Sequence, residues 1–302
     1  MMSASHHPAL SELQLLSVNS LNHTQLWRGR WQASATLPAV PVLIKQLQPN
    51  PPDWLYHQWL NAYQALTACQ PLAITNKHSH DTTSQSYGSP SYGISELITA
   101  DLSQDAPYWV LGYYDGVTLS QRLLVTDFDW FQRLSVAIRV CQLVDRIHCL
   151  GYLHRDIKPS NILLTHPDKL ILLDFGLAQA LTELQSATQD SAIHRSTTAG
   201  TPAYMSPEQL TGQALTQQSD YYSLGVVLFE LFSGTRPFSA HHLHDWALAH
   251  CQQLIPLLPN IAQLSAHQQT QLQHIIDSLL AKSTQYRAIA LSDIVAELND
   301  FI

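Results

Sequence analysis

The chain has 302 residues, of which 45% are hydrophobic and only 13% are charged, and its formal net charge is -8. This length allows one large domain or two lobes with a sizeable buried core, while the shortage of cations argues against a nucleic-acid-binding surface and a polybasic membrane anchor. No apolar run reaches the roughly 18–20 residues of a membrane span, and the N-terminus lacks the pattern of a signal peptide. The four cysteines have no metal-ligand spacing, so we expect a reduced, cytoplasmic protein.

The first third of the chain is predicted to be rich in strands. Short β-compatible runs lie at 13–18, 25–33, 40–47, 93–100 and 107–114. Between them, apolar residues recur at helical spacing from 54 to 68, namely Leu55, Trp59, Ala62 and Leu66. The stretch 75–93 is polar, rich in Gly, Pro and Ser, and without periodicity, so it is interpreted as a mobile insertion.

Beyond Asp115-Gly116 the pattern becomes mostly helical. We expect Asp127 to cap a helix that runs to about Leu150, with one apolar face formed by Phe131, Leu134, Ile138 and Cys141. Two short strands are expected at 161–164 and 170–173, a flexible loop at 177–203, and helices near 219–233, 241–254, 268–282 and 291–301. The order predicts an α+β fold in one domain, 1–302, with a β-rich N-lobe (about 10–114) and a helical C-lobe (about 117–302).

Residues 154–161 read His-Arg-Asp-Ile-Lys-Pro-Ser-Asn, and Asp174-Phe175-Gly176 follows. This ordered set resembles the bacterial branch of the eukaryotic-like Ser/Thr protein kinases. The resemblance covers essentially the whole chain and is strongest from 109 to 237. It implies transfer of the γ-phosphate of ATP to Ser or Thr hydroxyls of protein substrates, with ATP and Mg²⁺ as cofactors.

The resemblance also implies a role for each polar residue of these motifs. Asp156 matches the family's proton acceptor, and Lys158 matches the cation that offsets charge on the transferred phosphate. Asn161 and Asp174 stand at the positions of the Mg²⁺ ligands, which suits a cation that prefers oxygen donors. The alternative is a purely structural polar turn, and His154 and Phe175 are interpreted as structural in either case.

The segment 200–209 is similar to the family's substrate-docking loop. Thr201 matches the threonine that bonds near the catalytic Asp and Lys, Glu208 is expected to pair with Arg287, and Asp220 is expected to anchor the catalytic-loop backbone. Arg155 matches the residue that docks a phosphate carried by the activation loop. The candidate phosphorylation sites are Thr197 and Thr198, then Ser196 and Ser191.

In the N-lobe, Val42-Leu43-Ile44-Lys45 resembles the strand whose lysine contacts the nucleotide phosphates. The resemblance implies a nucleotide site that also includes Asp174 and the following residues: Leu26, Leu43, Leu111, Gly112, Tyr113 and Leu163.

Three features depart from the family pattern, all in the N-lobe. The glycines of the phosphate loop would fall at Asn19, Leu21 and Thr24, which carry side chains. The glutamate partner of Lys45 is replaced, with Ala62 at its expected position and Gln58 one turn earlier. Leu43 is bulky where a small residue usually contacts adenine. A pseudokinase that binds or scaffolds without catalysis therefore remains an alternative, and the docking loop argues against a small-molecule phosphotransferase.

Overall fold

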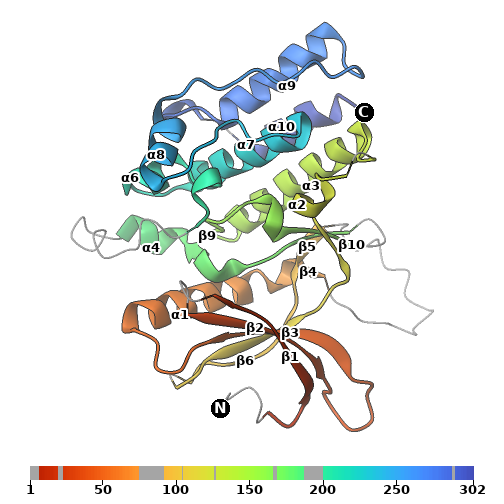
Figure 1. Ribbon diagram of the computed structural model, residues 1–302, viewed down its shortest axis with the longest axis vertical. Coiled ribbons are helices and arrows are strands. Elements are labelled where there is room, and N and C mark those ends of the chain that lie inside the picture. The colour runs from red at the N-terminus through yellow and green to blue at the C-terminus, as the bar shows by residue number, and fades with distance from the viewer. Residues whose placement is uncertain are drawn as a thin grey trace. The chain divides into compact units, whose positions relative to one another are not determined.

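The computed structural model describes residues 7–19, 23–74, 92–103, 105–125, 127–165, 169–186, 200–287 and 290–302. The chain divides into two compact units, Met1–Asp115 and Gly116–Ile302. The first is rich in strands and the second in helices, so the α+β class is confirmed (Figure 1). The four candidate phosphorylation sites lie outside the described residues, as does the predicted insertion except for Tyr92 and Gly93, which begin a strand.

The first unit contains a five-stranded antiparallel sheet in the order β1-β2-β3-β7-β6. Its strands are β1 (Leu10–Asn19), β2 (Thr24–Trp31), β3 (Val40–Leu47), β6 (Leu97–Asp101) and β7 (Tyr108–Gly112). Helix α1 (Asp53–Ala68) is followed by the 3-10 turn η2 (Gln70–Leu72) and by the parallel pair of β4 (Ala73–Ile74) and β5 (Tyr92–Ser95).

The two faces of this sheet bury different kinds of side chain. Val42 and Ile44 of β3 pack with Tyr108 and Val110 of β7 on one face. Because side chains alternate along a strand, Lys45 points to the other face, where it stands opposite Trp109 in the β3–β7 ladder. Helix α1 packs against Trp109 through Trp59, and the apolar residues predicted for this helix are all buried: Leu55, Trp59, Ala62 and Leu66. The predicted helix and its buried face are confirmed.

The second unit is built mainly from helices (Figure 1). The longer ones are α3 (Trp130–Cys149), α7 (Gln217–Ser233), α8 (Leu243–Gln252), α9 (Ala266–Leu279) and α10 (Leu291–Asn299), and the shorter ones are α2 (Leu119–Arg122), α4 (Leu181–Ser186) and α6 (Pro207–Thr211). Strand β10 (Ile162–Thr165) pairs with β8 (Gly116–Thr118) and β11 (Lys169–Leu172), and β9 (Tyr152–Leu153) pairs with β12 (Gln179–Ala180). Part of the predicted loop 177–203 is therefore regular structure, since it contains β12 and α4.

The predicted start of the long helix α3 was two residues too early. Asp129, rather than Asp127, caps the helix, because its carboxylate accepts a hydrogen bond from the backbone N–H of Gln132 at 2.8 Å. Asp127 instead forms an exposed ion pair with Arg122. Phe131 is 60% exposed, and the aromatic residue that packs inward is Trp130, against Phe232 and Phe301. The other predicted members of the apolar face, Leu134, Ile138 and Cys141, are buried as expected.

Helix α7 is buried along almost its whole length, between α3 on one side and α9 on another. Its Gly225 permits a close approach to α9, because an added Cβ would lie 2.7 Å from the Cβ of Leu279.

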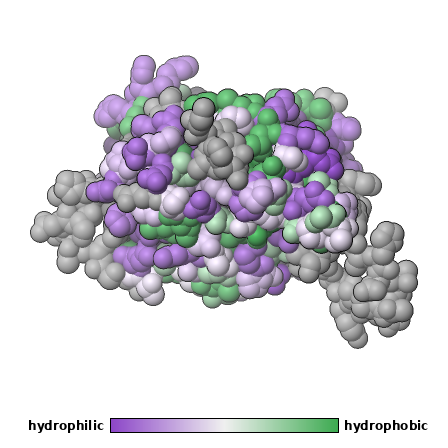
Figure 2. Space-filling view, turned by 90° about the horizontal axis from the view of Figure 1, so that it is seen from below, coloured by the Kyte–Doolittle hydropathy of each residue, from purple (hydrophilic) through white to green (hydrophobic). Residues whose placement is uncertain are grey.

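The surface of the molecule carries hydrophobic as well as polar side chains. Leu15, Leu16 and Val18 of β1 are all more than 40% exposed, and Figure 2 shows hydrophobic residues among hydrophilic ones on one face of the molecule.

Candidate active site

The segment from His154 to Asn161 connects β9 to β10 in the second unit and carries a strained backbone. Arg155 has a φ of 68°, in the left-handed region that residues with a side chain rarely adopt. Asp220, at the start of α7, accepts hydrogen bonds from the backbone N–H groups of His154 and Arg155, each at 2.8 Å. The predicted anchoring of this loop by Asp220 is confirmed, and the two bonds explain how the strained residue is retained.

Asp220 is fully buried and remains ionised because of its neighbours. Burial alone would raise its pKa, but the hydrogen bond and charge of His148, together with the charge and backbone N–H of His154, hold the pKa below its usual value. The Nε2 atom of His148 donates to Asp220 Oδ2, the oxygen that also accepts from the His154 N–H, at 2.9 Å. His148 is thus a supporting residue that the sequence motifs did not identify.

The predicted catalytic residues of this loop converge around one carboxylate. The Lys158 ammonium lies 2.6 Å from Asp156 Oδ2 and also donates to the hydroxyl of Thr201 at 2.8 Å. The side-chain amide of Asn161 donates to the same Asp156 oxygen at 3.0 Å and to the Asp156 carbonyl at 2.9 Å. The structure therefore brings Asp156, Lys158, Asn161 and Thr201 together, with the 3-10 turn η3 (Pro159–Asn161) fixing the spacing.

Asp174 follows β11 and is tied to the same loop through backbone contacts. It has a φ of 58°. Its Oδ1 accepts a hydrogen bond from the N–H of Gly176 at 3.1 Å, so Asp174 caps the N-terminus of the 3-10 turn η4 (Phe175–Leu177). The His154 ring packs edge-on against Phe175 and donates to the Leu173 carbonyl at 3.0 Å. The N–H of Leu173 donates to the Asn161 carbonyl at 2.8 Å. These contacts agree with the structural interpretation of His154 and Phe175.

The donor atoms of Asn161 and Asp174 suit Mg²⁺. Because Asn161 uses its amide nitrogen toward Asp156, its amide oxygen is the atom that a cation would contact, and Asp174 presents an exposed carboxylate. Among the described residues there is no cluster of three or more His, Cys, Asp or Glu side chains. Two protein oxygen donors, completed by phosphate oxygens and water, are the usual way in which Mg²⁺ is held.

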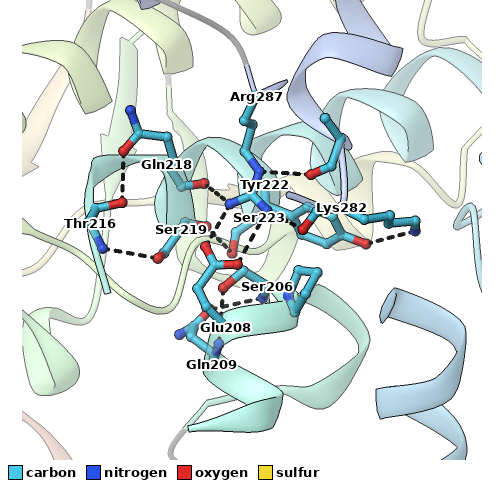
Figure 3. A network of polar contacts seen from close by, with 12 residues as sticks. Ser206, Glu208, Gln209, Thr216, Gln218, Ser219, Tyr222, Ser223, Lys282 and Arg287 are labelled. Atoms are coloured by element: carbon cyan, nitrogen blue, oxygen red, sulfur yellow. Dashed lines mark hydrogen bonds and ion pairs between the residues drawn. The ribbon is translucent and has the colours of Figure 1, made fainter. Parts of the chain in front are cut away.

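The docking segment is fixed by a buried polar network, drawn in Figure 3. Arg287 donates to both oxygens of Glu208, at 2.6 and 3.2 Å, and to the Gln218 carbonyl. Glu208 and Arg287 are each only 3% exposed, so the predicted pairing is confirmed. Ser206 caps α6, and Gln209 donates to the carbonyl of Arg155 at 3.0 Å. Gln209 thus links the docking segment to the strained loop, a contact that no sequence motif indicated.

A second polar chain lies next to this network. Lys282 contacts the Tyr222 hydroxyl at 3.4 Å, and this hydroxyl lies 3.0 Å from Nδ1 of His250, on α8. Burial, and secondly the charge of Lys282, lower the pKa of His250 to about 4, so its ring is neutral near pH 7. Burial likewise lowers the pKa of Lys282 to about 8.

His250 also packs between Phe238 and Trp246, which form an apolar cluster with Ala203 of the docking segment. In the same segment, the Tyr204 hydroxyl donates to Glu230 at 2.6 Å. The 3-10 turn η5 (Pro202–Tyr204) is therefore held by α7 and α8 through both apolar and polar contacts.

In the first unit, four of the residues predicted to contact nucleotide share one face of the sheet: Leu26, Leu43, Lys45 and Leu111. The register places Leu26 opposite Lys45, Lys45 opposite Trp109, and Leu43 opposite Leu111. Gly112 ends β7, and Tyr113 lies beneath the guanidinium of Arg28, 4.4 Å from its ring centroid. Leu163 lies in the second unit, on β10, and is buried.

The departures from the motif pattern also have positions in the structure. Ala62 is completely buried on α1, and Gln58 lies one turn earlier and is half-buried. Asn19 ends β1 and Thr24 begins β2, whereas Leu21 lies outside the described residues. The residue beside Lys45 that sequence reasoning missed is Trp109, since only the strand register brings the two together.

The architecture and these motifs define the class of protein. The family model for the protein kinase domain matches residues 82–296, so the chain belongs to the protein kinase family. It is 31% identical over 211 residues to the probable serine/threonine-protein kinase PknB of Lactococcus lactis, covering 68% of this chain and 31% of that protein. It is 40% identical over 135 residues to the serine/threonine-protein kinase PknB of Mycolicibacterium smegmatis, covering 44% of this chain and 21% of that protein.

The chain spans about a third or less of the length of these relatives. Among the described residues, no helix has both the length and the apolar character needed to cross a bilayer. The family match begins at residue 82, so β1, β2, β3 and α1 precede it.

Proposed function

We propose that this chain is a Ser/Thr protein kinase that transfers the γ-phosphate of ATP to Ser or Thr hydroxyls of proteins, in the presence of Mg²⁺. The observation that carries the proposal is the group around Asp156. There, a carboxylate contacts both a cation at 2.6 Å and an amide at 3.0 Å, next to the anchored and strained loop. Phosphoryl transfer requires mainly positioning and charge neutralisation, which this arrangement suits.

Each residue has a proposed role in the reaction. Asp156 orients the substrate hydroxyl and accepts its proton, as the bond between this oxygen and the γ-phosphorus forms and the bond to the β-phosphate oxygen breaks. Lys158 offsets the charge on the transferred phosphoryl group, and Thr201 holds the ammonium of Lys158. Asn161 and Asp174 would hold Mg²⁺, which supplies charge neutralisation on the phosphates when bound.

The nucleotide contacts are proposed on the shared sheet face and on Leu163. Lys45 contacts the α- and β-phosphates, Leu26, Leu43, Leu111 and Leu163 contact the adenine, and the backbone of Gly112 and Tyr113 hydrogen-bonds its edge. The Asn19 and Thr24 side chains stand where glycines would allow close backbone approach to phosphate. We therefore expect weak ATP affinity and a slow but measurable rate of transfer.

The decisive experiment combines two measurements on the purified chain. Binding of ATP with Mg²⁺ is followed by thermal shift and calorimetry, and transfer is followed with radiolabelled ATP, by autophosphorylation and on a generic Ser/Thr substrate protein. Phosphate on Ser or Thr that depends on Asp156 supports the proposal. A fall in transfer of about 10²- to 10⁴-fold in Asp156→Asn, with an unchanged melting temperature, would be the strongest support.

The second candidate function is that of a pseudokinase, a kinase-shaped module without catalysis. It is favoured by Ala62, which is fully buried on α1 where the family pattern has a glutamate, and by the bulk of Leu43. Nucleotide binding without transfer in the same pair of assays would favour this candidate, and so would the absence of both.

A further inference from the structure

Gln179, on β12, is a buried polar residue next to the loop that carries Asp156. The β9–β12 ladder places it directly opposite Leu153, two residues before Arg155. Its position is therefore set by strand register, and only 7% of its surface is exposed.

The side chain of Gln179 connects a guanidinium to a carboxylate. Its Oε1 accepts a hydrogen bond from Nη1 of Arg155 at 2.7 Å, and its Nε2 donates to Oε2 of Glu183, on α4, at 3.3 Å. Because a guanidinium can only donate and a carboxylate can only accept, these partners fix which way the amide points. A continuous chain thus runs from Arg155 through Gln179 to the negative charge of Glu183.

Arg155 directly precedes the proposed proton acceptor, and its strained backbone is held from two other elements. Asp220 of α7 accepts from its N–H at 2.8 Å, and Gln209 of α6 donates to its carbonyl at 3.0 Å. Gln179 adds a contact to its side chain, from a third element. Since Asp156 is the next residue, a shift of Arg155 would also displace the Asp156 carboxylate.

Glutamine is a demanding choice at this position for packing alone. A buried amide costs free energy unless both of its polar ends are hydrogen-bonded, whereas leucine, of similar size, would fill the space without that cost. Hydrogen bonds to charged groups are stronger than those between neutral groups, and Gln179 makes one at each end. The link between Arg155 and Glu183 is a use of the amide that packing does not explain.

We propose that Gln179 and Glu183 hold Arg155, and with it the loop that follows, so that phosphoryl transfer needs no phosphate at this position. The inference rests on the proposed function, in which Asp156 accepts the hydroxyl proton. It also revises the expectation, drawn from the resemblance, that Arg155 docks a phosphate of the activation loop, because Glu183 supplies negative charge from within the chain. Gln179 and Glu183 are positioning residues, since they act through Arg155.

The first test measures transfer to a generic Ser/Thr substrate protein at several ATP concentrations. We expect kcat to fall about 10- to 100-fold in Gln179→Leu with little change in KM for ATP, because a displaced proton acceptor affects the chemical step more than binding. Thr182→Ala is the matched control, since Thr182 is exposed and lies next to Glu183 on α4. A wild-type kcat in Gln179→Leu would assign the glutamine to packing and overturn the inference.

A charge-swapped variant separates positioning from packing. Gln179→Glu/Glu183→Gln keeps one carboxylate and one amide, so the carboxylate can accept directly from Arg155 and from the amide. We expect kcat near that of the wild type in this double variant. A folded double variant as slow as Gln179→Leu would contradict the inference. Where Gln179→Leu does not fold, Glu183→Ala, at a half-buried position, takes its place, and an unchanged kcat there would count against the role of the chain.

The second test removes phosphate from the chain. The purified wild type is treated with a Ser/Thr phosphatase, its loss of phosphate is checked by mass spectrometry, and the initial rate of transfer is measured after the phosphatase is removed. We expect this rate to equal that of the untreated protein. A lower initial rate, with a lag that ends as phosphate returns to residues 177–203, would overturn the inference.

Amide hydrogen exchange without nucleotide distinguishes this inference from the proposed function. We expect residues 152–161 to exchange faster in Gln179→Leu than in the wild type, and at the wild-type rate in Thr182→Ala and in the charge-swapped variant. If the wild type transfers no phosphate, the kinase assignment fails, while exchange still decides whether Gln179 holds the loop. Equal exchange in Gln179→Leu and the wild type, both folded, would show that it does not.

Discussion

The two units of this chain hold their polar groups in different ways. In the second unit, buried polar side chains are tied together by charge-assisted hydrogen bonds, such as Arg287 to Glu208 at 2.6 Å and His148 to Asp220 at 2.9 Å. In the first unit, the cation expected to contact nucleotide lies beside an indole, and a buried alanine stands where the motif has an acid. The family match excludes residues 1–81, which contain most of the first unit's sheet and α1.

This contrast shows which parts of the motif set depend on one another. A buried ion pair that loses one partner leaves an uncompensated charge, so the groups of the second unit can change only together. At the corresponding place in the first unit, Ala62 carries no charge, so no buried ion pair constrains that position. The first unit could therefore depart from the pattern while the second retained it.

Asp156→Asn, in the second unit, is the variant with the largest expected effect. We expect transfer to fall by about 10²- to 10⁴-fold, because the amide cannot accept the hydroxyl proton, while ATP binding and the melting temperature stay near those of the wild type. Radiolabelled phosphate incorporation and a thermal melt measure the two effects. Asp127→Asn, in an exposed pair, is the control with wild-type transfer. Retained activity in Asp156→Asn would show that the chemistry is not centred there.

Glu208→Ala tests the buried pair of the second unit. It leaves Arg287 buried without its partner, and we expect a loss of roughly 3–5 kcal/mol in the free energy of unfolding. Urea unfolding measures this loss. Asp127→Ala, which breaks an ion pair whose carboxylate is 82% exposed, should change stability by only about 0–1 kcal/mol. Similar losses in the two variants would contradict the importance assigned to burial.

Acid should act on the second unit through His250. Its pKa is about 4 in the folded chain against an ordinary 6.5, so the unfolded state takes up the proton first as the pH falls. The stabilising effect of the neutral ring is complete above pH 6.5 and is lost between about 6.5 and 4, amounting to roughly 3 kcal/mol. Titration of Lys282, whose pKa is lowered to about 8, changes stability only at pH values above the range in which His250 titrates.

The measurement is urea unfolding at several pH values for the wild type, His250→Gln and His267→Gln. The slope of stability against pH should flatten in His250→Gln and remain unchanged in His267→Gln, because His267 is exposed. Parallel curves for all three proteins would remove His250 as the group responsible.

The smallest expected effect lies in the first unit. Leu43→Ala removes bulk from the sheet face that carries Lys45, and we expect ATP to bind about 2- to 5-fold more tightly, a change of about 0.4–1 kcal/mol. Calorimetry with ATP and Mg²⁺ measures it, and Leu37→Ala, at a position 54% exposed, is the control. Weaker binding in Leu43→Ala would show that the side chain supports the adenine instead of crowding it.

The sequence predicted the second unit's site better than the first unit's, for a physical reason. Asp156, Lys158 and Asn161 are close in sequence, so a short turn brings them together and the motif spacing is sufficient. Glu208 and Arg287 are far apart, but each lies in a segment with its own motif. The contact of Lys45 with Trp109 depends instead on the register of two strands separated by more than sixty residues, which no local pattern encodes.

Element boundaries show the same limit. The alternation and periodicity of apolar residues predicted β3 and α1 closely, because burial alone selects those positions. The start of α3 was misjudged because both Asp127 and Asp129 can cap a helix, and the choice depends on which aromatic residue packs inward. Trp130 does so, against Phe232 and Phe301, and this is a tertiary contact.

The pairing of Glu208 with Arg287 has a consequence for the order in which the protein is made. The two residues are 79 positions apart, and the docking segment depends on both. Since a nascent chain leaves the ribosome from its N-terminus, the buried pair that holds residues 200–209 can form only after Arg287 has emerged. A partly synthesised chain that already contains Asp156 and Asp174 would therefore still lack the buried ion pair that holds the docking segment.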